Sequence, residues 1–299
     1  MNEVKIGILG QRGGWHTVAL QEALARRGIT ASCFSITRLV ARLSGRPWLT
    51  AGGDGEALES YAALFVRAIP GGSLEQIIFR VDALHRLENA GVRVVNSPTA
   101  IERTVDKYYT ATLLEDAGLP TPRTIVTERF DEALAAFHEL GGDVVVKPIF
   151  GSEGRGMVRV SDPDLAYRTF RTLELGRYVY YVQEFVPHGQ RDFRIFVVGG
   201  EVVAAMVRQG KNWKTNVAQG AGTRALDVDD ELREMALRAA ETLGTDYAGV
   251  DVLPVEVDGE FRGYTVVEIN GIPGWRGLQA ATGVNVADRV VDYVLKGVI

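Results

Sequence analysis

Residues Val250–Gly277 read VDVLPVEVDGEFRGYTVVEINGIPGWRG and are typical of two β-strands. The connection between them contains Asp258-Gly259, a dipeptide that is common in hairpin turns. Glu268 and Asn270 are two residues apart on the second strand, so their side chains project from one face. If the connection has an even number of residues, Asp251 on the first strand shares that face.

Two lengths of the connection satisfy this condition. A two-residue loop (258–259) places Asp251 opposite Val266, and a six-residue loop (258–263) places it opposite Asn270. In either register three hard oxygen ligands converge, which suits Mg²⁺ held jointly by protein and phosphates. A loop of odd length, or a bulge at Pro254, would break this arrangement. Alone, the same residues could equally be a solvent-facing polar row on a half-exposed sheet.

The composition is that of an ordinary globular protein. The chain has 299 residues, of which 46% are hydrophobic and 24% charged. A chain of this length buries roughly three quarters of its unfolded surface, and two domains are expected, with one or three possible. The 33 basic and 38 acidic residues give a net charge of −5 without a long basic run. The sequence therefore gives little support for nucleic-acid binding.

Few residues are available for disulfides, metal clusters or membrane insertion. Cys33 is the only cysteine, which excludes an internal disulfide and a cysteine-rich metal site. The histidines show no His-x-x-x-His pairing. The N-terminus enters a strand-like run within four residues without a signal-peptide pattern, and no apolar run approaches the length of a membrane span. We therefore expect a cytoplasmic soluble protein that binds neither membranes nor nucleic acid.

Residues 1–97 are expected to form a small open α/β domain. Strand-like and helical patterns alternate, which predicts a parallel sheet covered on both faces. The predicted strands lie near residues 4–9, 30–36, 63–69 and 92–95, and the predicted helices near 17–27 and 74–90. Segment 42–56 is rich in Gly and polar residues and is predicted to be irregular. Gly10, Gly13 and Gly14 do not fit the dinucleotide-binding fingerprint, and the P-loop pattern is absent.

Pro98-Thr99 marks the next boundary. Thr99 and Glu102 form a capping-box pattern that opens a predicted helix, with Lys107 outside its apolar stripe. That stripe comprises Ile101, Val105, Tyr108, Thr112 and Leu113. Later predicted strands lie near residues 123–126, 144–148, 157–160, 178–185, 193–198 and 201–208, and helices near 130–140, 163–173, 230–243 and 286–296.

The strand ending in Lys147 and the segment Gly151–Gly156 form a second informative region. A lysine inside an apolar strand must be paired or directed at an anion, because an unpaired buried ammonium is costly. Three glycines in six residues allow the backbone to approach a ligand and direct N–H groups at phosphate oxygens. An ordinary flexible hairpin with Lys147 reaching the surface would show the same pattern.

The order and spacing of these motifs resemble the RimK-like ATP-grasp carboxylate–amine ligases, from about residue 96 to residue 290. The residues that carry the resemblance are VVVK (144–147) with the glycine segment (151–156), QEFV (183–186), Asp192-x-Arg194, VVGGEVVAA (197–205), AGVD (248–251) and VEIN (267–270). The family implies an ATP-grasp fold, which is an α/β class. Its expected parts are an N-terminal open parallel α/β domain (1–97), a small α+β lid domain (98–184) and a larger C-terminal α+β domain with an antiparallel sheet (185–299).

The resemblance also implies roles for individual residues. Those implied to bind ATP are Lys107, Lys147, Gly151, Ser152, Gly154, Gly156, Gln183, Glu184, Phe185, Val186, Asp192, Lys214 and Asn216. The metal ligands implied are Asp251, Glu268 and Asn270, holding two Mg²⁺ ions, with Mn²⁺ possible. Arg194 and Arg208, together with Lys147, would stabilise the charge that develops on the transferred phosphate, and the glycine segment would act as a mobile lid.

The implied reaction is phosphorylation of a carboxylate by ATP, followed by attack of an amine. The segments 212–221 and 270–277 look most like the branch that adds L-glutamate to tetrahydromethanopterin or related one-carbon cofactors. Arg276, with its neighbour Trp275, would meet a substrate carboxylate or only anchor a loop. Arg67 and Arg80 are similar candidates for binding an acidic acceptor. Trp15 and His16 would line the acceptor pocket or pack against a glycine-rich segment.

Other functions remain open at this point. Within the family, the alternatives are ligases that act on a lysine-biosynthesis carrier protein and ligases that modify a ribosomal protein. The net charge of −5 argues mildly against an acidic carrier as partner. A different class would be a nucleotide-binding regulatory module without turnover, which retention of the lysines and metal ligands disfavours. The family resemblance makes a homodimer or homotetramer plausible.

Overall fold

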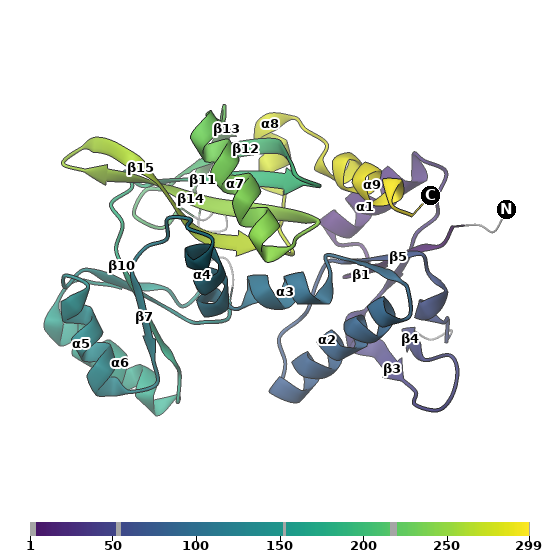
Figure 1. Ribbon diagram of the computed structural model, residues 1–299, viewed down its shortest axis with the longest axis horizontal. Coiled ribbons are helices and arrows are strands. Elements are labelled where there is room, and N and C mark those ends of the chain that lie inside the picture. The colour runs from purple at the N-terminus through teal and green to yellow at the C-terminus, as the bar shows by residue number, and fades with distance from the viewer. Residues whose placement is uncertain (1–3, 52–54, 152–153, 216–219, 299) are drawn as a thin grey trace.

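The computed structural model describes residues 4–51, 55–151, 154–215 and 220–298, which form three main sheets (Figure 1). The N-terminal sheet lies at the right of Figure 1, a five-stranded sheet at the upper left and a small four-stranded sheet at the lower left. Within this described part, no helix is long and apolar enough to span a membrane.

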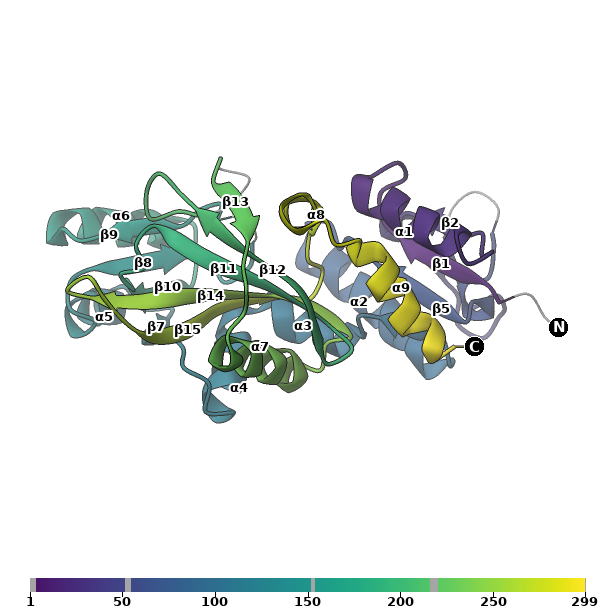
Figure 2. The ribbon, with the colours of Figure 1, turned by 90° about the horizontal axis from the view of Figure 1, so that it is seen from above.

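The N-terminal sheet is parallel, as predicted, with the order β2-β1-β5-β6. Its strands are β1 (Ile6–Leu9), β2 (Ser32–Phe34), β5 (Ala63–Val66) and β6 (Arg93–Val95). Helices α1 (Trp15–Ala25) and α9 (Val286–Lys296) pack side by side on one face, and α2 (Leu74–Asn89) packs on the other (Figures 1 and 2). The predicted covering of both faces is confirmed, and one of the covering helices comes from the other end of the chain.

The prediction of an irregular segment 42–56 is wrong in part. Strands β3 (Leu39–Ala41) and β4 (Leu49–Ala51) form an antiparallel ribbon between two 3₁₀ turns, η1 (Ile36–Arg38) and η2 (Leu58–Ser60). The β4 side chains are buried, and the Glu59 carboxylate accepts hydrogen bonds from the N–H groups of Trp48 and Leu49. Burial and this side-chain acceptor order a segment whose composition is typical of loops.

The helix predicted after residue 98 is two helices, α3 (Pro98–Val105) and α4 (Lys107–Asp116). The predicted capping box is wrong, because Ser97 caps α3 and Pro98 occupies its first position. Asp106 then interrupts the helix, since its carboxylate accepts the N–H of Tyr109 as the cap of α4. The predicted apolar stripe therefore does not form, and Val105 and Tyr108 are exposed. The break makes Lys107 the first residue of α4.

The small sheet is antiparallel, with the order β7-β10-β8-β9. Its strands are β7 (Thr124–Thr127), β8 (Val144–Lys147), β9 (Val158–Val160) and β10 (Tyr180–Glu184). Helices α5 (Phe130–Glu139) and α6 (Pro163–Leu175) cover one face (Figure 1). Val144 and Val146 belong to the core beneath these helices, so the alternation along β8 directs Lys147 to the opposite face.

The large sheet is antiparallel, with the order β13-β12-β11-β14-β15. Its strands are β11 (Arg191–Val198), β12 (Glu201–Gln209), β13 (Gly222–Ala225), β14 (Tyr247–Val257) and β15 (Glu260–Asn270). Helix α7 (Asp230–Leu243) packs on one face, and aromatic residues on the other pack with α8 (Arg276–Thr282) against the N-terminal sheet. The sequence reasoning placed neither α8 nor β13.

The β14–β15 hairpin has the predicted two-residue turn, with φ of 53° at Asp258 and 79° at Gly259. However, Asp251 pairs with Glu268 and not with Val266, because the register shifts at two irregularities along the hairpin. Each adds one residue to β15. One bulge would have turned Asp251 to the opposite face, as anticipated for Pro254, but the second bulge returns it.

Asn96 joins the N-terminal sheet to the open end of this hairpin. Its side chain is completely buried, and its amide nitrogen donates to the carbonyl oxygens of Tyr247 at 2.8 Å and Gly271 at 2.5 Å. Its amide oxygen accepts the N–H groups of Asp246 at 2.6 Å and Tyr247 at 3.1 Å. One side chain therefore holds the start of β14 and the residue that follows β15.

The domain boundaries at 97/98 and 184/185 stay a prediction. The two positions separate the strands of the three main sheets from one another along the chain. However, α3 and α4 pack against α7 and against β15 of the large sheet. The segment 98–116 therefore contacts elements on both sides of the second boundary.

Candidate functional site

A cleft lies between the small and the large sheet, and residues of both sheets line it. Most of the described residues predicted to bind ATP line it, namely Lys107, Lys147, Gly154, Gln183, Glu184, Phe185, Val186, Asp192 and Lys214. Arg208, Asp251 and Glu268 line it as well. Gly151, Gly156, Arg194 and Asn270 are not among the lining residues, and Ser152 and Asn216 fall outside the described residues.

Lys147 is a half-buried cation of the cleft. Its ammonium donates to the side-chain oxygen of Gln183 at 2.5 Å, and Gln183 in turn donates to the hydroxyl of Thr124 at 2.9 Å. Burial lowers the pKa of Lys147 to about 8, and the charge of Lys107 acts in the same direction, although Glu268 raises it in part. A neutral amide is a weak counterpart for this charge, so an anionic ligand would stabilise the ammonium.

Two further lysines contact the first residue of the glycine segment and the residue that follows the segment. The ammonium of Lys107 donates to the carbonyl oxygen of Gly151 at 2.7 Å and lies 4.0 Å from a Glu268 carboxylate oxygen. The ammonium of Lys214 donates to the carbonyl oxygen of Met157 at 2.8 Å. Three lysines from α4, β8 and the segment after β12 therefore meet around one cleft.

The end of β10 provides the less charged part of the cleft. Glu184 accepts from the backbone N–H and the guanidinium of Arg123 at 2.9 and 2.8 Å. The guanidinium of Arg159 lies 3.4 Å from the ring centroid of Phe185, and the Trp213 ring meets Phe185 edge-on. This part has the mixture of apolar surface and hydrogen-bonding groups that a nucleobase requires.

Several lining residues were missed by the sequence reasoning: Met157, His188, Trp213, Thr215 and Leu253. Trp213 could have been found, because it is an aromatic residue in an otherwise polar segment. The others give no signal in the sequence, since the fold alone brings them to the cleft.

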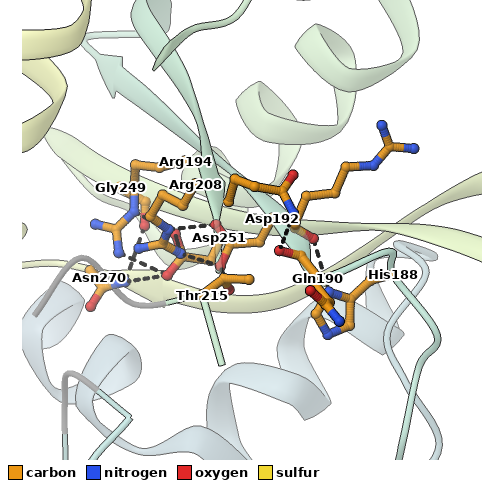
Figure 3. A network of polar contacts seen from close by, with 11 residues as sticks. His188, Gln190, Asp192, Arg194, Arg208, Thr215, Gly249, Asp251 and Asn270 are labelled. Carbon is orange, nitrogen blue, oxygen red and sulfur yellow. Dashed lines mark hydrogen bonds and ion pairs between the residues drawn. The ribbon is translucent and has the colours of Figure 1, made fainter. Parts of the chain in front are cut away.

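A buried charge network forms the floor of the cleft (Figure 3). The guanidinium of Arg194 forms a two-bonded pair with Asp251, and Arg208 lies 3.0 Å from the same carboxylate. Arg208 also binds both oxygens of Asp192, which accepts a hydrogen bond from Thr215. Burial would raise the pKa of Asp251, but the two guanidinium groups outweigh it and hold that pKa below its ordinary value. Both carboxylates are thereby matched by arginines.

The predicted metal ligands lie together at the edge of this network. Glu268 is directly opposite Asp251, and the Asn270 amide nitrogen points toward Asp251 at 3.5 Å, while no hydrogen bond within the described residues involves the Asn270 oxygen. No group of three His, Cys, Asp or Glu side chains that could hold a metal occurs among the described residues. An ion here would thus need the Asn270 oxygen and oxygens of a ligand. This all-oxygen donor set fits Mg²⁺ bound together with phosphates.

Three of the four predicted substrate residues have structural contacts instead. Arg67 donates to the Tyr247 hydroxyl at 3.0 Å and to the Pro273 carbonyl at 2.7 Å. Trp275 is fully buried beneath the Arg67 guanidinium. Buried Arg80 donates to the Pro70 carbonyl at 2.5 Å. These contacts give the three residues a structural role, and their part in binding an acceptor stays a prediction, as does that of the exposed Arg276.

Comparisons with known proteins agree with this geometry. A model of the RimK-like ATP-grasp domain matches residues 104–294. The tetrahydromethanopterin:alpha-L-glutamate ligase of Methanosarcina acetivorans is 33% identical over 262 residues, which cover 79% of this chain and 81% of that protein. The alpha-aminoadipate–LysW ligase LysX of Sulfurisphaera tokodaii is 36% identical, covering 69% of this chain and 73% of that protein.

A solved structure shows the same fold. The ATP-grasp ligase PsnB, complexed with minimal precursor, Mg and ADP, superposes with a TM-score of 0.74. It is 24% identical and covers 97% of each chain. The expected ATP-grasp fold is confirmed.

Proposed function

Because the chain belongs to the RimK-like ATP-grasp family and is an ATP-grasp ligase, we propose that it joins L-glutamate to a carboxylate of a small acceptor. The proposed acceptor is a pterin-type or related one-carbon cofactor. ATP would phosphorylate the acceptor carboxylate and leave as ADP. The glutamate amine would then attack the acyl-phosphate, form the amide and release phosphate.

The observation that carries this proposal is the environment of Lys147. Its ammonium is half-buried at the wall of the cleft, and its closest partner among the described residues is a neutral amide oxygen. The triphosphate of ATP would supply the missing negative charge, with Lys107 and Lys214 at the sides of the same cleft. Arg194 and Arg208 would hold the acidic floor in place, and residues 183–186 would meet the adenine.

Asp251, Glu268 and Asn270 are the proposed ligands of two Mg²⁺ ions, with Mn²⁺ as a possible substitute. Mg²⁺ bound there would offset charge on the phosphoryl group that is transferred. Glu268 suits this role, since it is half-exposed toward the cleft and its nearest cation, Lys107, is 4.0 Å away. Asp251 would share its oxygens with the arginines that already hold it.

The pterin-type acceptor is preferred to a carrier protein for two reasons. The tetrahydromethanopterin:alpha-L-glutamate ligase similarity extends over more of this chain than the LysX similarity. In addition, the net charge of −5 would repel an acidic carrier. A homodimer or homotetramer working in the cytoplasm is part of the proposal, and light scattering of the purified protein would test the oligomer.

The test is incubation with Mg-ATP, L-glutamate and a panel of pterin, deazaflavin, furan-cofactor and peptide acceptors. Mass spectrometry should find a glutamyl unit added to the pterin-type acceptor, with ADP released in step. Mass gain only on a lysine-biosynthesis carrier would replace the proposed acceptor. ATP binding without turnover on any acceptor would instead favour a regulatory module.

Two variants test the residues. Lys147→Ala and Glu268→Ala should each lower turnover on the order of 100-fold, as loss of one charge-stabilising group does in other enzymes. Arg233→Gln, at an exposed position of α7, is the control and should turn over normally. Near-normal turnover of both variants would contradict the assignment of these residues to the active site.

A further inference from the structure

A second hollow lies outside the cleft, at one edge of the N-terminal sheet. Its lining comes from the segments that follow three parallel strands and from the neighbouring ribbon, and includes Gly10, Arg12, Cys33, Arg38, Glu56 and Ala68. We call this hollow the crevice. None of the residues that line the cleft lines it.

The topology of the sheet places the crevice where such folds bind ligands. From β1 the chain continues through α1 to β2 on one side, whereas β5 continues through α2 to β6 on the other side. The direction of winding therefore reverses between β1 and β5. In open parallel sheets, ligands bind beyond the carboxyl ends of the strands at such a reversal. Gly10 follows β1 and Ala68 follows β5, and both line the crevice.

The charged groups of the crevice favour an anion. Arg12 and Arg38 are exposed, and neither has a hydrogen bond or an ion pair with a described residue. Glu56 is the only acidic residue among the described lining residues, and its carboxylate is 3.4 Å from the ammonium of Lys5. Arg12 and Cys33 both line the crevice, and the charge of Arg12 opposes the effect of burial, which raises the pKa of the Cys33 thiol.

The crevice is also linked to β15, the strand that carries the proposed metal ligands Glu268 and Asn270. Arg67 follows β5, its N–H donates to the carbonyl of Leu9, and its guanidinium holds the carbonyl of Pro273. Pro273 is three residues beyond Asn270. In addition, His16 at the start of α1 accepts the N–H of Trp275 at 3.0 Å. The loop that leaves the proposed metal site is thus fastened to the edge of the sheet that forms the crevice.

We propose that the crevice binds an anionic group, a carboxylate or a phosphate, at the end of the acceptor remote from the carboxylate that is activated. The proposal rests on the proposed ligase function, because it assigns the crevice to the same acceptor. It predicts a preference for long acceptors with a charged far end. It also explains why Arg67 and Arg80, the arginines suggested by the sequence, need not contact the acceptor.

Cys33 makes a site-specific test possible, because it is the only cysteine and lines the crevice. The rate of its alkylation by the neutral reagent N-ethylmaleimide is measured in the full chain with increasing inorganic phosphate, and separately with glutarate, at constant ionic strength. An anion bound at Arg12 should slow alkylation by covering the thiol and by cancelling the positive charge that favours the thiolate. Each variant is compared with itself without anion.

The expected result is saturable protection of the wild type by at least one anion. Arg12→Gln and Arg38→Gln should raise the half-protecting concentration about tenfold, as loss of a charge-assisted hydrogen bond does. Arg233→Gln should behave as wild type. Protection by phosphate alone identifies a phosphate group, and protection by glutarate alone identifies a carboxylate. Absence of protection by both anions, or equal protection in the arginine variants, would overturn the proposal.

Turnover gives an independent measurement. With the acceptor found in the panel, Arg12→Gln and Arg38→Gln should raise KM for the acceptor with kcat and KM for ATP unchanged. An unchanged KM for the acceptor would also overturn the proposal. If no acceptor is turned over, the ligase assignment fails while the Cys33 measurement still decides whether the crevice binds anions.

Discussion

Replacing Lys147 with methionine should stabilise the protein near neutral pH while it strongly lowers turnover. The pKa of Lys147 is lowered from 10.5 to about 8, chiefly by burial. The unfolded chain therefore binds more protons than the folded chain between these two pH values. Below both values, the folded protein must hold the Lys147 ammonium in its charged form, which lowers the free energy of unfolding. A shift of this size corresponds to roughly 3 kcal/mol. The stability of the wild type should rise as pH increases from about 8 to about 10.5.

Methionine has a similar length and no charge, so Lys147→Met removes the penalty. It also removes the hydrogen bond to Gln183, which offsets about 1–2 kcal/mol of the gain. The net stabilisation near neutral pH is therefore about 1–2 kcal/mol, while turnover falls on the order of 100-fold as in the alanine variant. Above pH 10, the advantage of the variant should disappear, because the wild-type lysine is then largely neutral in the folded protein.

The assay is urea unfolding of the wild type and Lys147→Met across this pH range. The difference between their free energies of unfolding is compared, because the contributions of other titrating groups are the same in both proteins and cancel. Lys296→Met, at an exposed lysine at the end of α9, is the matched control and should follow the wild type at every pH. Parallel stability profiles of wild type and Lys147→Met would refute the reasoning, because they would mean that folding does not oppose the charge of Lys147.

Two further variants test the junction between the N-terminal sheet and the hairpin. Asn96→Ala should lower the free energy of unfolding, measured by urea unfolding, by at least about 3 kcal/mol. The reason is that the substitution leaves buried N–H and C=O groups at the start of β14 without partners. A change below about 1 kcal/mol would contradict the role given to Asn96. His16→Gln should make the protein less sensitive to acid. Burial, and then the charges of Arg67 and Arg276, lower the pKa of His16 to about 4. The stability of the wild type should therefore fall as pH drops from 6.5 through 4. Unfolding measured at both ends of this pH range should show a smaller loss for the variant, and an equal loss would exclude His16 as the titrating group.

Local patterns predicted most elements of the fold but not the positions at which two patterns compete. The alternation of strands and helices indicated the parallel sheet, and α9 begins and ends where its pattern predicts. The break between α3 and α4 was missed because Asp106 fits a helix by periodicity but caps the next helix instead. Likewise, Ser97 and Thr99 are both suitable N-cap residues, and only the three-dimensional path of the chain determines that Ser97 caps α3.

The hairpin shows a different limit. Counting residues from the turn at Asp258 predicts the wrong partner for Asp251, because two bulges in β15 change the count. Bulges depend on packing against neighbouring strands and have no reliable signal in one sequence. The prediction that Asp251, Glu268 and Asn270 share a face nevertheless agrees with the register, since two shifts preserve the alternation.

The candidate site was predictable where charge stands out against an apolar background. Lys147 and Asp192 interrupt apolar strands, and the structure places both in the cleft. Arg67 and Arg80 stand out in the same way, yet they bind backbone carbonyls. A charged residue in an apolar segment shows that a partner is required, but the sequence does not tell whether that partner is a ligand or the protein itself.

The four hydrogen bonds of Asn96 have a consequence for engineering the hairpin. Since this side chain fastens both strands at their base, the spacing of the proposed metal ligands is set there and not at the turn. The tip around Asp258-Gly259 is far from that anchor along both strands, and its residues are exposed. A peptide tag or a fluorescent reporter inserted between these two residues would therefore extend the hairpin outward while nucleotide chemistry continues at its base.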